Sequence, residues 1–208
     1  TLGTTEDESS ITEETHFNQD AANNVYSLTK YAAEMEVWRA TQEGLDAVIV
    51  NPGVILGAGS WHTGSGAIFK LAHKGMSYFT SGSIAVVDVR DVVLAMQGLM
   101  NSDLKNERYI LVGATLSYKE FTKELALAFD KNPPEKEIAE WKLLLLSNID
   151  GLASSLFGTK RKLQKANVKS LYTRSNYNAH KIEKALSFSF TTASQTIKRV
   201  ASDYKSEH

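Results

Sequence analysis

The 208-residue sequence contains no cysteine, so it can form neither a disulfide framework nor a reactive thiolate. This fits a reducing compartment, and we expect a cytoplasmic protein. Charge of one sign is not in excess either, since the formal net charge is −1 and the pI is near 6.5. We therefore expect neither nucleic acid nor a membrane as a partner. The most apolar run, the four leucines of residues 143–146, is far shorter than the roughly 20 residues of a membrane span.

Metal-binding patterns are also missing. The five histidines show no paired spacing with carboxylates or with one another, so we expect no metal site. The acidic residues near the start of the chain are expected to form a solvated surface. These are Glu6, Asp7, Glu8, Glu13 and Glu14.

The feature that points to chemistry is a tyrosine four residues before a lysine, Tyr26 and Lys30, in an alanine-rich segment that predicts a helix. This spacing places both side chains on one helix face. A neighbouring ammonium favours the phenolate, which equips the phenol for general acid/base catalysis. The spacing alone is weak evidence, because Tyr177 and Lys181 show it too.

The residues downstream favour Tyr26. Its predicted helix continues to Gly44, a suitable C-cap, and the apolar run of residues 47–50 then ends in Pro52-Gly53. A short, β-branched run of this kind is typical of a buried parallel strand whose carboxyl end faces a ligand. No such strand follows Tyr177, which we interpret as a structural residue.

Taken together and in this order, YSLTK, VIVNPGVILG, AVVDVRDVVLAM and RYILVG resemble the extended short-chain dehydrogenases/reductases, with the dihydroflavonol-reductase-like proteins as the nearest subgroup. The resemblance covers residues 1–129 and continues faintly to the C-terminus. It implies an α/β fold: the C-terminal part of a Rossmann-like parallel sheet with a smaller, mostly helical substrate lobe. Residues 1–132 would be the C-terminal part of the dinucleotide-binding domain with inserted substrate-lobe segments, and residues 133–208 the helical substrate lobe.

The resemblance also implies roles for single residues. Tyr26 matches the catalytic acid/base, and Lys30 matches the lysine that holds the nicotinamide ribose and lowers the tyrosine pKa. The turn that contacts the nicotinamide carboxamide matches Asn51, Pro52, Gly53, Val54 and Ile55. At Gly53 a residue without a Cβ would allow close approach of the cofactor. Trp61, in a glycine-rich loop, and Arg90 are weaker candidates for contacts with a small-molecule substrate.

The chain departs from the family in one respect. No G-x-x-G-x-x-G follows a strand, although that turn seats the dinucleotide pyrophosphate. The chain also begins with Thr1. We interpret it as a C-terminal fragment, inactive alone, of a longer enzyme that binds NAD or NADP and forms a homodimer. The parent is expected to be a carbonyl or dihydroflavonol-type reductase; the alternatives are a nucleotide-sugar epimerase/dehydratase and a non-catalytic binding module with the same fold.

Capping residues predict further helices. Asp88 should cap a helix that runs to Asn101, and Ser117 with Glu120 should form a capping box before another. Asp88, Arg90 and Asp91 are better explained by a cap and an ion pair than by catalysis. Residues 64–74, 140–157, 177–186 and 192–204 also predict helices, and residues 83–87 and 107–112 predict strands. The basic cluster of residues 160–169 is interpreted as a solvated helix face.

Overall fold

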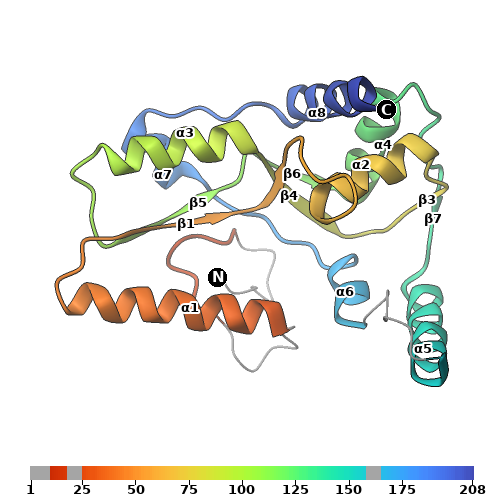
Figure 1. The fold of residues 1–208 in the computed structure, drawn as a ribbon, viewed down its shortest axis with the longest axis horizontal. Helices are drawn as coiled ribbons and strands as arrows, with labels where there is room; N and C mark the ends of the chain where they lie inside the picture. The colour runs from red at the N-terminus through yellow and green to blue at the C-terminus, as the bar shows by residue number, and fades with distance from the viewer. Residues whose placement is uncertain (1–9, 18–24, 158–164) are drawn as a thin grey trace.

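A computed structural model of the chain describes residues 10–17, 25–157 and 165–208 (Figure 1). The predictions about Glu6, Asp7 and Glu8 lie outside these residues. In chain order the elements are α1 Val25–Gln42, β1 Val48–Pro52, β2 Val54–Leu56, α2 Gly64–Lys74, β3 Tyr78–Phe79, β4 Ser83–Asp88, α3 Val89–Met100, β5 Glu107–Leu111, β6 Ala114–Ser117, α4 Tyr118–Ala128, β7 Lys136–Glu137, α5 Glu140–Phe157, α6 Lys165–Ser170, α7 His180–Leu186 and α8 Ala193–Glu207.

Side-chain caps set where several helices begin, as the sequence predicts. Asp88 accepts a 2.8 Å hydrogen bond from the backbone N–H of Arg90 at the start of α3. Ser117 and Glu120 form the predicted capping box at the start of α4, and Thr192 caps α8 in the same way. These side chains satisfy N–H groups that have no partner within the helix.

Five of the strands form two small sheets that meet at two glycines, and β3 and β7 pair in parallel as a third sheet. β1 and β5 pair in parallel, with Val50 opposite Tyr109. In the second sheet β2 pairs with β4 in parallel, and β6 pairs with the other side of β4 in antiparallel orientation. Backbone bonds join the sheets, because Gly53 N–H donates to Leu111 and Gly113 N–H donates to Val86. The predicted α/β class is confirmed, while the sequence analysis missed the short strands β2, β3, β6 and β7.

Helices cover both faces of the β1–β5 pair. Figure 1 shows α3 and α7 on one face and α1 on the other. The α3–α7 side is a continuous apolar cluster, in which Tyr109, Ile110 and Leu111 of β5 pack against Leu99 of α3 and Ile182 of α7. The α1 side differs, because the only buried side chains of this 18-residue helix are Glu34 and Thr41.

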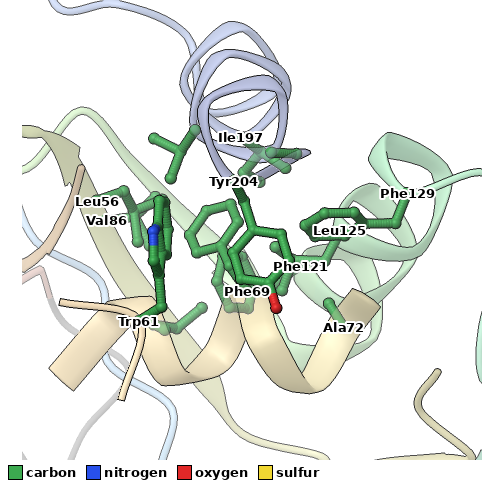
Figure 2. Packing of buried hydrophobic residues seen from close by; sticks show 13 residues of the cluster. Leu56, Trp61, Phe69, Ala72, Val86, Phe121, Leu125, Phe129, Ile197 and Tyr204 are labelled. Atoms are coloured by element: carbon green, nitrogen blue, oxygen red, sulfur yellow. The ribbon is translucent and has the colours of Figure 1, made fainter. Parts of the chain in front are cut away.

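A second apolar cluster lies between α2, α4 and α8 and the sheet formed by β2 and β4 (Figure 2). Phe69, Phe121 and Ile197 are among its buried members. Helices α7 and α8, from the last third of the chain, thus pack on elements of the first two thirds. The boundary at residue 132 stays a prediction. No helix of the described residues is long and apolar enough to cross a membrane.

A buried ion pair fastens α8 to the junction of β4 and α3. The Asp88 side chain is 2% exposed, and both its oxygens accept hydrogen bonds from Arg199 Nη2, at 2.7 and 2.8 Å. Thr196 Oγ1 donates a further bond of 3.0 Å. Burial by itself would raise the pKa of Asp88, but these bonds, the Arg90 amide and the Arg199 charge lower it below its usual value. The predicted cap and ion pair are both confirmed.

Replacing this carboxylate should weaken the fold in a pH-dependent way. Because the folded-state pKa is lowered, the interaction stabilises the protein above the unfolded pKa of about 4 and is lost as pH falls through the folded pKa. Asp88→Asn should lower the free energy of unfolding at pH 7 by about 2–4 kcal/mol. In urea titrations this difference should shrink as pH falls below about 4.

Asp130→Asn, which removes an exposed ion pair with Lys205, is the control and should change the free energy of unfolding little. An equal loss at pH 3 and pH 7 would contradict the assignment.

Candidate active site

Tyr26 and Lys30 lie in the first two turns of α1, at the end of the β1–β5 pair where β1 ends (Figure 1). Four residues apart on one helix, they share a face. Tyr26 is 72% exposed and Lys30 is exposed as well. Tyr177, by contrast, precedes α7, which begins at His180, so it does not share a helix face with Lys181. The helix predicted from residue 177 thus begins at His180 in the structure, three residues later than expected.

The predicted cofactor turn joins the two sheets. Asn51 and Pro52 end β1 opposite Ile110 and Leu111 of β5, and the next two residues after Gly53 begin β2. Val54 and Ile55 keep 38% and 36% of their surface exposed. The turn and the first turn of α1 thus lie at the same carboxyl end of β1. In open α/β sheets this is the edge where ligands bind.

Gly53 is needed for packing within the chain. A Cβ at this position would lie 2.7 Å from the carbonyl oxygen of Ala85 and 3.2 Å from Val112 Cγ2. The expected reason, close approach of a cofactor, is therefore not required to explain the glycine. Its contact with a cofactor stays a prediction.

A single carboxylate, that of Glu34, connects the predicted catalytic helix to both strands. Glu34 Oε2 accepts a 3.2 Å hydrogen bond from Asn51 Nδ2 of β1. Glu34 Oε1 accepts bonds from Arg108 Nη1 of β5 at 3.1 Å and from Trp38 Nε1 at 3.4 Å. Burial raises the pKa of Glu34, whereas the hydrogen bonds from Arg108 and Asn51 lower it.

Sequence reasoning missed Glu34, although one signal was present. Glu34 follows Lys30 by four residues and therefore shares its helix face. A carboxylate among the apolar positions of a helix needs a partner when it is buried. That partner, Arg108, is 74 residues away in sequence, and only the fold shows the pairing.

Arg108 also holds the segment of residues 10–17 against β5. Its Nε donates to the carbonyl of Glu13 at 2.8 Å, and its Nη2 donates to the carbonyls of Glu13 and Thr15. The Glu13 carboxylate accepts a 2.9 Å bond from the Ile110 N–H. Glu13 is only 8% exposed, so its expected place on a solvated surface is wrong. The Glu13 carboxylate thereby accepts the hydrogen bond of a backbone N–H at the edge of β5. A strand edge with free N–H groups invites pairing with another chain.

Trp61 is a core residue. It is 5% exposed, and its ring lies 4.9 Å from that of Tyr204, nearly perpendicular to it (Figure 2). Its indole N–H donates a 2.6 Å bond to Glu207 of α8. This packing accounts for the tryptophan without a substrate. The Arg90 side chain is exposed, and the Arg90 backbone N–H donates to Asp88, the capping residue of α3. The substrate contacts of both residues stay predictions.

Neither of two cavities in the described part of the chain is lined by Tyr26, Lys30 or the turn after β1. One of about 460 Å³ lies between the segment of residues 13–17, α1 and the start of β5. The other, of about 320 Å³, lies beyond the carboxyl end of β5 and includes Gly113, Thr115 and Tyr177 in its wall. The candidate catalytic pair therefore faces the outside of the described chain.

Comparison with known proteins finds relatives that are similar in sequence and structures that are similar in fold. The family model of the NAD-binding "Male sterility protein" group matches residues 2–95. The protein named "Putative dihydroflavonol 4-reductase" of Synechocystis is 26% identical over 180 residues, which are 83% of this chain and 52% of that protein. Sterol demethylase protein B of Methylococcus capsulatus is 33% identical over 90 residues, 42% of this chain and 27% of that protein.

Solved structures agree in fold. The structure titled gox2253 has a TM-score of 0.81 at 20% identity, covering 99% of this chain and 63% of that one. A nucleoside-diphosphate-sugar epimerase from Pseudomonas aeruginosa has a TM-score of 0.73 at 20% identity, covering 94% and 60%. A dTDP-glucose 4,6-dehydratase from Bacillus anthracis, in complex with NAD, has a TM-score of 0.68 at 16% identity, covering 99% and 58%.

The fold and the site edge are those of a Rossmann-type α/β protein. The family model and the Synechocystis relative agree with the resemblance to the extended short-chain dehydrogenases/reductases that the sequence motifs indicate. It spans about half the length of its Synechocystis relative and about three fifths of these solved structures.

Removing the charge of Glu34 should destabilise the attachment of α1. Glu34→Gln keeps the shape of the side chain but leaves the Arg108 guanidinium without a counter-charge, so the free energy of unfolding should fall by about 1–3 kcal/mol. Urea denaturation measures the change. Glu36→Gln is the matched control on the same helix, because Glu36 forms an exposed ion pair with Arg39. If both variants behave alike, the Glu34 network does not hold the helix.

Gly53→Ala should destabilise the junction of the sheets by about 1–3 kcal/mol, because the new Cβ would overlap backbone atoms of Ala85. Gly113→Ala is the control, since its Cβ would meet Phe190 Cβ at 3.3 Å and side chains adjust more easily. Thermal unfolding of both variants checks the expected order. A Gly113→Ala variant that is less stable than Gly53→Ala would contradict it.

Proposed function

We propose that the protein containing this chain is an NAD(P)-dependent carbonyl reductase or dehydrogenase that uses Tyr26 and Lys30 as its acid/base pair. The observation that carries the proposal is their common helix face at the carboxyl end of β1, beside the turn at Asn51, Pro52 and Gly53. Their exposure favours it, because a proton-transfer group must be reachable by substrate.

The chain's own residues would move one proton. During reduction of a carbonyl, the Tyr26 hydroxyl donates its proton to the substrate oxygen; in the reverse direction the phenolate removes the proton of the alcohol. Lys30, one helical turn away on the same face, would hold the ribose hydroxyls of the nucleotide. The nicotinamide, when bound, supplies or accepts the hydride. Glu34 has a positioning role, since it ties the helix that carries both residues to β1 and β5.

The residues at this edge fit the nicotinamide half of such a cofactor. Asn51 Oδ1 is a buried acceptor that has no donor partner among the residues the structure describes, at the turn where a carboxamide N–H is expected to bind. A buried acceptor of this kind is costly unless a donor reaches it. Lys30, exposed at the same edge, can donate to ribose hydroxyls. Solved relatives at 13–18% identity carry NAD or NADPH, according to their titles.

Support for reduction over epimerisation comes from sequence similarity. The Synechocystis relative, which matches 83% of this chain over 180 residues, is named as a putative dihydroflavonol 4-reductase. The neighbours named as epimerases or dehydratases are at most 20% identical and support the fold alone. The competing interpretation is a non-catalytic module, which the missing glycine-rich turn in this chain favours.

Binding and turnover of the full-length protein separate these interpretations. Tyr26→Phe should lower kcat at least about 100-fold while largely preserving the fluorescence change of bound NADH or NADPH. Tyr26→Phe combined with Lys30→Ala should abolish that change. Tyr177→Phe is the matched control and should keep wild-type turnover.

The proposal fails if Tyr26→Phe turns over like Tyr177→Phe, or if neither nucleotide binds to the full-length protein. A product analysis that finds inversion of a sugar carbon without net consumption of NAD(P)H would assign the protein to the epimerases instead.

A further inference from the structure

The cavity of about 460 Å³ beside α1 lies apart from the candidate active site. Its walls are residues 13–17, α1 and the start of β5, and Figure 1 shows the first of these segments between α1 and the β1–β5 pair. Because β1 and β5 run in parallel, the start of β5 is at the opposite end of the pair from the predicted cofactor turn. A volume of this size is typical of small-molecule sites. The cavity is therefore a candidate for a second ligand.

Aromatic side chains form one wall of the cavity. The rings of Phe17 and Tyr31 stack with their centres 4.5 Å apart. Tyr31, Met35 and Trp38 line the cavity from α1, where their spacing of four and three residues places them on one helix face. The face of an aromatic ring is electrostatically negative and attracts a cation.

Two carboxylates line the same cavity without a positive partner. Glu13 is only 8% exposed, and its Oε1 accepts the 2.9 Å hydrogen bond from the Ile110 N–H. Its Oε2 has no hydrogen-bond partner among the described residues, and the neighbouring Glu14 is exposed. Within the described part of the chain, neither carboxylate forms an ion pair. A carboxylate as buried as Glu13 is costly unless a positive charge accompanies it.

The positive side chains of the wall are engaged with other groups. Arg108 pairs with Glu34 and donates to backbone carbonyls of residues 13 and 15. Lys181 pairs with Glu107, which also lines the cavity. His16 is exposed and counts as neutral in the formal charge. The charges of Glu13 and Glu14 are therefore left over, and the wall is negative.

We propose that this cavity binds a small organic cation, whose positive group meets the carboxylates of Glu13 and Glu14 and the ring faces of Tyr31 and Trp38. Carboxylates and ring faces both favour positive charge, and both disfavour an anion. A neutral ligand of the same shape would gain only the apolar contacts. The bound cation would touch α1, β5 and residues 13–17 together, and it would offset the cost of burying Glu13.

A pair of isosteric probes tests the proposal on the full-length protein. Choline carries a quaternary ammonium, and 3,3-dimethyl-1-butanol has the same shape without the charge. Titration of each probe is followed by NMR at the indole N–H of Trp38, which is assigned by its loss in Trp38→Phe. Choline should bind with a Kd at least about tenfold lower than the alcohol, because only the cation gains from rings and carboxylates. The indole signals of Trp61 and Trp141, which do not line the cavity, should stay in place.

Variants locate the charge that selects the ligand. Glu14→Gln should weaken choline binding about fivefold, because it removes one unit of negative charge from an exposed part of the wall. Tyr31→Leu should weaken it by a similar factor through loss of a ring face. Glu36→Gln is the matched control, because Glu36 lies on the same helix outside the cavity and pairs with Arg39. It should leave the Kd for choline unchanged.

Equal affinity for choline and 3,3-dimethyl-1-butanol would overturn the proposal. So would a Glu36→Gln variant that loses as much choline affinity as Glu14→Gln, or a shift of all three indole signals alike. These titrations contain no nucleotide, so their outcome is independent of the proposed reductase activity.

Discussion

The geometry of the candidate site depends on one carboxylate, that of Glu34, in the contact between α1 and the β1–β5 pair. The helix buries only Glu34 and Thr41, so apolar contact contributes little to its position. Glu34 instead accepts hydrogen bonds from Asn51 of β1 and Arg108 of β5. These two bonds place Lys30 and Tyr26, about one and two turns earlier on the same helix, at the carboxyl end of β1. A directional, charged interaction of this kind determines rotation about the helix axis more strictly than apolar contact does.

Helix α8 is attached to β4 and α3 by a similar carboxylate, that of Asp88. Asp88 ends β4, caps α3 and pairs with Arg199 of α8, so one buried carboxylate joins three elements. The pKa of Asp88 is lowered, which means that its partners outweigh burial and the carboxylate stays ionised at neutral pH. The two networks lie where elements distant in sequence meet, and the apolar clusters supply most of the burial elsewhere.

Local signals predicted much of the secondary structure. The caps at Asp88 and Ser117 and the strand after the Tyr26 helix were found because each depends on neighbours within a few residues. The short strands β2 and β6 were missed, since three or four residues carry no periodicity to detect. Glu13 was placed in solvent because composition cannot show that a sheet edge needs an acceptor. Trp61 was assigned to a loop over substrate because its partners, Tyr204 and Glu207, lie more than 140 residues away.

The sequence by itself determined the α/β class, the helix that carries Tyr26 and Lys30, and the strand and turn that follow it, because periodicity, caps and a Pro-Gly stop act locally. Only the tertiary structure decided which carboxylates are buried, what Gly53 packs against, and which face of α5 meets water. Those outcomes depend on contacts between residues far apart in the chain, where the balance of desolvation against hydrogen bonding is set by the neighbours that folding brings together.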